Sequence, residues 1–104
     1  MDKYRSTLSE LGTTYDDALL TKVAKGLGPS IYNADSSLVS ATDQTELDRV
    51  KNNFLIKKLG LADSADLDKA VKEVADAMKS IRQKPRAVFY YLLTVKLGQQ
   101  SHYA

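Results

Sequence analysis

The chain has 104 residues, the usual size of one domain, and its 43% hydrophobic and 27% charged residues are typical of a soluble globular protein and unlike those of a disordered or bilayer-spanning chain. A formal net charge of +2 is too small to indicate a class of partner, and the lack of cysteine excludes disulfides and thiolate metal sites. We therefore expect one folded domain, residues 1–104, in a reducing compartment.

Leu-Gly dipeptides predict the ends of four helices, because glycine adopts the left-handed conformation that closes a helix. They occur at positions 11–12, 27–28, 59–60 and 97–98. The first predicted helix carries Tyr4, Leu8 and Leu11 on one face. Its sequence lacks the apolar core of a secretion signal, so we expect a cytoplasmic protein.

The second predicted helix begins at Thr14, whose hydroxyl can cap the following turn. Asp16 and Asp17 then lie near its positive N-terminus, where carboxylates are favourable. Leu20 and Val23 belong to its apolar stripe.

Residues 28–42, GPSIYNADSSLVSAT, interrupt the helical pattern with Gly-Pro and four serines, and we call them the polar loop. A turn of helix is expected at 30–34 within it. Loops of this length are commonly functional or packed as compact elements. Tyr32, Asn33 and Asp35 are the contacts that we expect it to offer to a partner.

A third helix is predicted to open near Thr42 and Asp43, where the D-x-x-E sequence of Asp43 and Glu46 resembles a capping box, and to end at Gly60. Its apolar face contains Leu47, Val50, Phe54 and Leu55. Asn52 and Asn53 are weak helix formers inside it. Either both are exposed, or one bonds the backbone of the polar loop, which is the interpretation we favour.

The fourth predicted helix starts at Asp63 or Ser64 and has the most regular apolar spacing in the chain, with Leu67, Val71, Val74, Met78 and Ile81. Its polar face allows three ion pairs at i,i+4 spacing, Asp68–Lys72, Lys69–Glu73 and Lys72–Asp76.

Pro85 ends this helix or opens the next, where its missing N–H costs nothing. The fifth helix follows with Val88, Tyr91, Leu92 and Val95 on one face and further apolar residues around it, which predicts a central helix wrapped by the others. The apolar run 87–93 is too short to span a membrane. The expected core includes Leu20, Val23, Val50, Phe54, Val71, Val74, Met78, Val88, Leu92 and Val95.

Catalytic and cofactor motifs are hard to assemble from this sequence. The single histidine, His102, is the third residue from the end of the sequence, where we expect poor positioning, and Asp63, Asp66 and Asp68 do not have the spacing of a calcium loop. No glycine-rich phosphate loop is present. We expect no cofactor, no metal and no enzymatic activity.

Residues 77–104 contain five basic residues and no acidic residue. Lys79, Arg82, Lys84 and Arg86 form a candidate basic patch, although cations near helix C-termini also complement the helix dipole. Weak binding of nucleic acid or another acidic partner is therefore the alternative function. Stacking with bases would need an exposed ring at Tyr90 or Tyr103.

The stretch from Gly28 to Leu61, followed by RAVFYYLL at 86–93, resembles a family of small bacterial proteins known only as a domain of unknown function. The resemblance covers nearly the whole chain and implies a bacterial source and a compact, mainly helical domain. It supplies no activity, ligand or catalytic residue.

Taken together, these patterns predict an all-α bundle of about five short helices with one long polar loop. By elimination of catalytic motifs, we expect a small non-enzymatic binding or interaction protein. Its unknown protein partner or small ligand would meet the polar loop through Tyr32, Asn33 and Asp35.

Overall fold

The computed structural model describes residues 2–12, 15–26, 38–39, 43–81 and 84–100. Within them, the α-helices are α1 (Asp2–Glu10), α2 (Asp17–Gly26), α3 (Gln44–Val50), α4 (Ala65–Ala77) and α5 (Arg86–Lys96). The chain of α3 continues as a π-helix, η2 (Lys51–Ile56), and two short strands are β1 (Leu38–Val39) and β2 (Lys84–Pro85). The all-α prediction is confirmed. None of these helices is long and apolar enough to cross a bilayer.

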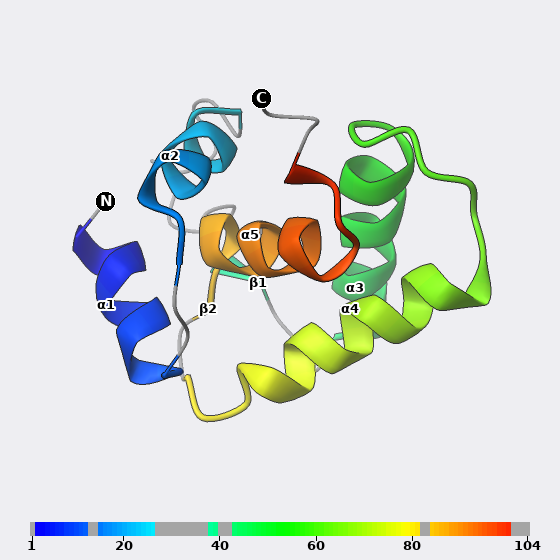
Figure 1. Ribbon diagram of the computed structural model, residues 1–104. Helices are drawn as coiled ribbons and strands as arrows, with labels where there is room; N and C mark the ends of the chain where they lie inside the picture. The colour runs from blue at the N-terminus through cyan, green and yellow to red at the C-terminus, as the bar shows by residue number, and fades with distance from the viewer. Residues whose placement is uncertain (1, 13–14, 27–37, 40–42, 82–83, 101–104) are drawn as a thin grey trace.

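Helix α5 crosses the centre of the molecule, with α1 and α2 on one side, α3 on the other and α4 passing beneath (Figure 1). Its buried residues lie on nearly every side of the helix, and they are Ala87, Val88, Phe89, Tyr90, Tyr91, Leu93 and Thr94. The predicted central helix is therefore confirmed.

The predicted core is correct at most positions but wrong at one end of α5. All of its members are buried except Leu92, which is partly buried, and Val95, which is 41% exposed. Phe89 and Leu93 are fully buried instead. Because α5 is apolar around most of its circumference, the spacing of its residues did not define which arc would remain open.

Glycines end the helices as predicted at three described positions, since Gly12, Gly60 and Gly98 have φ of 69°, 70° and 67°. Helix α2 begins at Asp17, later than predicted, and Asp16 caps it, while Thr14 lies outside the described residues. The Asp16 Oδ1 atom accepts hydrogen bonds from the Ala18 and Leu19 amides at 3.0 and 3.3 Å.

The Asp16 amide also joins α2 to the central helix, because it donates to the Tyr91 hydroxyl at 2.8 Å, a link between residues 75 positions apart. Helix α3 is capped by Asp43, which accepts from the Thr45 amide at 2.9 Å. The other half of the predicted capping box does not form as expected, since the Glu46 carboxylate bonds Arg86 of α5.

Helix η2 has the wide hydrogen-bond spacing of a π-helix. The Lys57 amide donates to the Asn52 carbonyl at 3.2 Å, and the Leu59 amide to the Phe54 carbonyl at 2.9 Å, both across five residues. Asn52 and Asn53 are both exposed, which is the interpretation we had not favoured. Phe54 points inward and stacks on Tyr90 with ring centroids 4.1 Å apart.

Of the polar loop, the structure describes only Leu38–Val39, so the predicted helical turn at 30–34 lies outside the described residues. These two residues form β1, which pairs antiparallel with β2 in the register Leu38 with Pro85 and Val39 with Lys84. The sequence did not predict this strand pair. It fixes one end of the polar loop to the segment that leads into α5.

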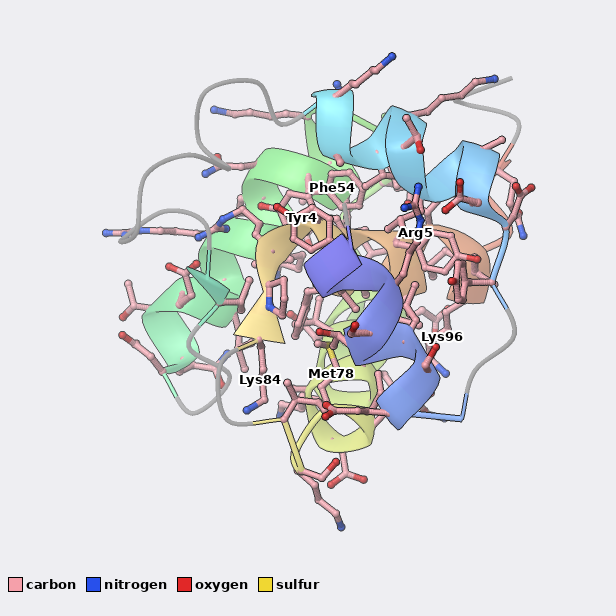
Figure 2. All side chains as sticks on the ribbon, turned by 90° about the vertical axis from the view of Figure 1, so that its left-hand side faces the viewer. Tyr4, Arg5, Phe54, Met78, Lys84 and Lys96 are labelled. Carbon is pink, nitrogen blue, oxygen red and sulfur yellow. The ribbon has the colours of Figure 1, made fainter. Side chains whose placement is uncertain are left out.

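Helix α4 buries the stripe predicted for it, with Leu67, Val71 and Val74 on the helix and Met78 and Ile81 in the turn that follows. Figure 2 shows Met78 below the central helix, at the α4 side of the core. Helix α4 starts directly after Ser64, one of the two predicted starting positions, and the Ser64 side chain makes no capping hydrogen bond.

Candidate functional site

The candidate residues of the polar loop, Tyr32, Asn33 and Asp35, lie outside the described residues, and so does Arg82 of the candidate basic patch. The remaining members of that patch have different environments. Lys79 is exposed and lies 4.0 Å from Asp76. The Lys84 ammonium donates to the carbonyl of Ile81 at 2.8 Å.

Arg86 is held inside the protein by partners from α3 and α5. Its Nη2 atom lies 2.6 Å from Glu46 Oε1, with only 14% of either side chain exposed. Its Nη1 atom donates to the Tyr90 hydroxyl at 3.1 Å, and the guanidinium lies 5.7 Å from the centre of that ring. Burial alone would lower the pKa of Arg86, but the hydrogen bonds with Tyr90 and Glu46 outweigh it and raise the pKa. The charge of Arg86 is therefore compensated within the fold.

Lys96 also belongs to residues 77–104, which we call the basic quarter, and it pairs with Glu73 through a hydrogen bond that lowers the pKa of the Glu73 carboxyl. Lys84 and Lys96 lie on opposite flanks in the view from the α1 side (Figure 2). Tyr90 is only 6% exposed and Tyr103 lies outside the described residues, so the structure does not show an exposed ring at either predicted stacking position. Nucleic-acid binding stays a prediction, and the described basic residues are mostly paired and dispersed.

A groove of about 350 Å³ lies where α4 crosses the lower end of α3 (Figure 1). We call it the α3/α4 groove, and it is lined by Gln44, Leu47, Asp48, Lys51, Asp68, Val71 and Lys72. The helical repeat explains this set, because the first four residues recur at i, i+3, i+4 and i+7 and the last three at i, i+3 and i+4. Each wall therefore presents one face of its helix.

Lys51 is the most enclosed charge of the groove, with 15% of its side chain exposed. Its ammonium lies 3.1 Å from Asp68 and 3.3 Å from Asp63. The hydrogen bonds to Asp68 and Asp63 raise the pKa of Lys51, so this side chain stays protonated at neutral pH. It joins the two walls as a fixed ion pair and cannot serve as a base.

Two other charges in the groove have no ion-pair partner among the described residues. The Asp48 carboxylate accepts one hydrogen bond, from the Gln44 amide at 2.9 Å. Lys72 was predicted to pair with Asp68 and Asp76, but Asp68 bonds Lys51 and Asp76 lies near Lys79. An exposed carboxylate on α3 and an exposed ammonium on α4 therefore face one groove.

Sequence reasoning did not identify this groove. The spacing of Asp48 and Lys51 beside Leu47 was visible, but a helical face does not reveal which other helix crosses it. Within the described part of the chain, no set of three or more His, Cys, Asp or Glu side chains is placed to hold a metal ion. The chemistry of the groove is therefore that of ammonium, carboxylate and amide groups over aliphatic side chains.

Comparison with known proteins identifies a family. A family model described as "Protein of unknown function (DUF2853)" matches residues 3–101. No curated protein matches the chain.

Proposed function

The chain belongs to the DUF2853 family, described only as proteins of unknown function, and we propose that it is a non-enzymatic binding protein whose site is the α3/α4 groove. The observation that carries this proposal is that Asp48 and Lys72, on opposite walls of one groove, have no ion-pair partner within the described part of the chain. Exposed lysines and carboxylates are ordinary on a protein surface. A pair that faces a shared hollow offers complementary contacts to a ligand.

Three features favour binding over catalysis at this place. The groove volume of about 350 Å³ lies at the lower end of the range for small-molecule sites. Its floor consists of Leu47 and Val71, which are buried and contribute no reactive group. The hydrogen bonds to Asp68 and Asp63 raise the pKa of Lys51, which disfavours nucleophilic or base chemistry by one of the two lysines of the groove.

The polar loop remains a competing site for a protein partner, with Tyr32, Asn33 and Asp35 as its contacts. Its support is the length and polarity of the segment, together with its attachment to β2 through β1. Binding of an acidic partner through Lys79, Arg82, Lys84 and Arg86 is the third proposal, supported by the excess of basic residues after position 76. The bacterial source and cytoplasmic location are likewise proposals, supported by the sequence resemblance and the lack of cysteine.

One nuclear magnetic resonance experiment separates the three sites. Backbone amide shifts of the isotope-labelled protein are followed while small zwitterions, inorganic phosphate and a short oligonucleotide are added in turn. We expect saturable shifts at Leu47, Lys51 and Val71 with at least one small probe. If these amides do not respond to any probe, the groove proposal is wrong.

The same spectra report on the competing sites. Oligonucleotide-induced shifts confined to residues 79–86, lost when salt is raised, would support phosphate contacts by the basic patch. For that patch we expect affinity no better than about micromolar at physiological salt, as for non-specific binding. Shifts confined to residues 28–42 would point to the polar loop.

A further inference from the structure

We propose that the ligand of the α3/α4 groove is a small zwitterion: one ammonium and one carboxylate group on a short apolar body, of amino-acid or dipeptide size. This inference rests on the proposed function and names its ligand class. It follows from the charges of the groove, from the composition of its floor and from its size.

The charge argument starts from the four charged residues that line the groove, Asp48, Lys51, Asp68 and Lys72. Lys51 and Asp68 neutralise each other at 3.1 Å. One carboxylate on α3 and one ammonium on α4 remain. The complement of that pair is a ligand whose ammonium group meets Asp48 and whose carboxylate meets Lys72.

Ligands with a single charge match this arrangement less well. An anion bound at Lys72 is attracted by the ammonium but repelled by the Asp48 carboxylate. A cation bound at Asp48 is attracted by the carboxylate but repelled by the Lys72 ammonium. Like charges placed together at a binding site weaken binding, and charge pairs of opposite sign select partners. A zwitterion satisfies both walls and adds no net charge.

The apolar part of the ligand has a defined place. Leu47 directly precedes Asp48 on α3, and Val71 directly precedes Lys72 on α4, and all four line the groove. Each wall therefore pairs an aliphatic side chain with one charge. A short hydrocarbon segment between the two ionic ends of the ligand would cover Leu47 and Val71, which favours binding through burial of apolar surface.

The walls are also fixed before any ligand arrives. Lys51 ties η2 to Asp63, ahead of α4, and to Asp68, within α4. Walls that are already linked need less ordering on binding, so more of the interaction free energy is retained as affinity. The wall changes from α-helix to π-helix at this lysine, and π-helical turns occur frequently at functional sites.

Isothermal titration calorimetry tests the ligand class with defined probes. The zwitterions are unbranched ω-amino acids from glycine to aminohexanoate, leucine, and the dipeptide Leu-Leu. Hexylamine and hexanoate carry the two charges separately. We expect the best zwitterion to bind at least about tenfold more tightly than either half, equivalent to about 1.4 kcal/mol. The preferred chain length distinguishes a free α-amino acid, with adjacent charges, from a dipeptide, with separated ones.

Single substitutions then locate the two charges. We expect Asp48→Asn and Lys72→Gln each to weaken binding of the best ω-amino acid by about tenfold or more. Matched controls are Asp66→Asn and Lys69→Gln, which alter exposed residues of α4 outside the groove and should bind like the unmodified protein. A double variant with Asp48→Lys and Lys72→Asp restores one charge of each sign with the polarity reversed, so it should recover binding of an unbranched ligand.

The outcomes separate this inference from the proposed function. Groove amides that shift equally with hexanoate or hexylamine and with the zwitterions would refute the zwitterion while the groove remains a binding site. Tight zwitterion binding that Asp48→Asn and Lys72→Gln leave unchanged would also refute it. No response of the groove to any probe would refute both.

Discussion

The ion pair between Glu46 and Arg86 permits the sharpest stability prediction. Glu46 forms ion pairs with two arginines: Arg86, at 2.6 Å with little exposure, and Arg49, at 3.9 Å with a side chain that is 68% exposed. Glu46→Gln removes the negative charge from both pairs and keeps a side chain of the same shape. Arg49→Gln removes only the exposed pair and is therefore the matched control.

The two variants should differ strongly in magnitude. Losing one partner of a buried ion pair costs about 3–5 kcal/mol, and a hydrogen bond to a charged group contributes about 1.5–3 kcal/mol. Because 14% of each side chain is exposed and Arg86 keeps its bond to the Tyr90 hydroxyl, we expect about 1.5–3 kcal/mol for Glu46→Gln. For Arg49→Gln we expect less than about 1 kcal/mol, as for exposed pairs.

Urea denaturation at neutral pH, followed by far-ultraviolet circular dichroism, measures both free energies of unfolding. For a domain of this size, Glu46→Gln should also lower the melting temperature by roughly 6 to 24 °C. A loss below about 0.5 kcal/mol, or one equal to that of Arg49→Gln, would show that the short contact between α3 and α5 contributes no more than a surface pair.

Three further predictions concern the core, pH and a helix end. Leu93→Ala should lower the free energy of unfolding by about 2–5 kcal/mol in urea denaturation, because Leu93 is fully buried. The exposed Val95 is the control, and Val95→Ala should cost less than about 1 kcal/mol. Equal costs would contradict the position of α5. Lys96 lowers the pKa of Glu73 below its usual 4.5, so the stabilisation is present above that pH and is lost as pH falls through the folded-state pKa. The melting temperature of the unmodified protein should therefore exceed that of Glu73→Gln at neutral pH and approach it in acid, and a gap that does not depend on pH would refute this. Gly60→Ala should cost about 1–2 kcal/mol in the same denaturation assay, from the positive φ alone, since nothing lies within 4 Å of an added Cβ atom; an unchanged midpoint would mean that the helix end relaxes.

Structural features that depend only on residues close together in the sequence were predictable. A glycine after the last apolar residue marks a helix end because few other residues tolerate a positive φ, and Gly12, Gly60 and Gly98 all have this conformation. The stripe of α4 was predictable because one side of that helix is polar. Asp43 was recognisable as a cap for the same local reason.

The outer face of α5 was not predictable. A helix that is apolar on most sides gives no periodic signal, so Val95 was assigned to the core and Leu93 was not included in it. The positions of the surrounding elements, among them α1, α2 and α4, decide which arc of α5 is covered.

The charges of the candidate site depend on contacts between distant residues. The i,i+4 spacing on one helix predicted an ion pair between Lys72 and Asp68. In the structure α3 and α4 cross, and Asp68 forms its ion pair with Lys51 instead. The charge of the basic quarter likewise looked uncompensated in the sequence, because its acidic partners lie far away along the chain. Glu46 precedes Arg86 by 40 positions, and Glu73 precedes Lys96 by 23. Local rules cannot supply such pairings.

The central position of α5 has a consequence for folding during synthesis on the ribosome. Helices α1 to α4 are synthesised first, but the surfaces they bury are completed by a helix that follows all of them in the chain. At a synthesis rate of about 5–20 residues per second, the apolar faces of the earlier helices remain exposed for several seconds before Phe89 and Leu93 emerge. Until α5 emerges from the exit tunnel, the nascent chain therefore exposes apolar surface that chaperones and other nascent chains can bind.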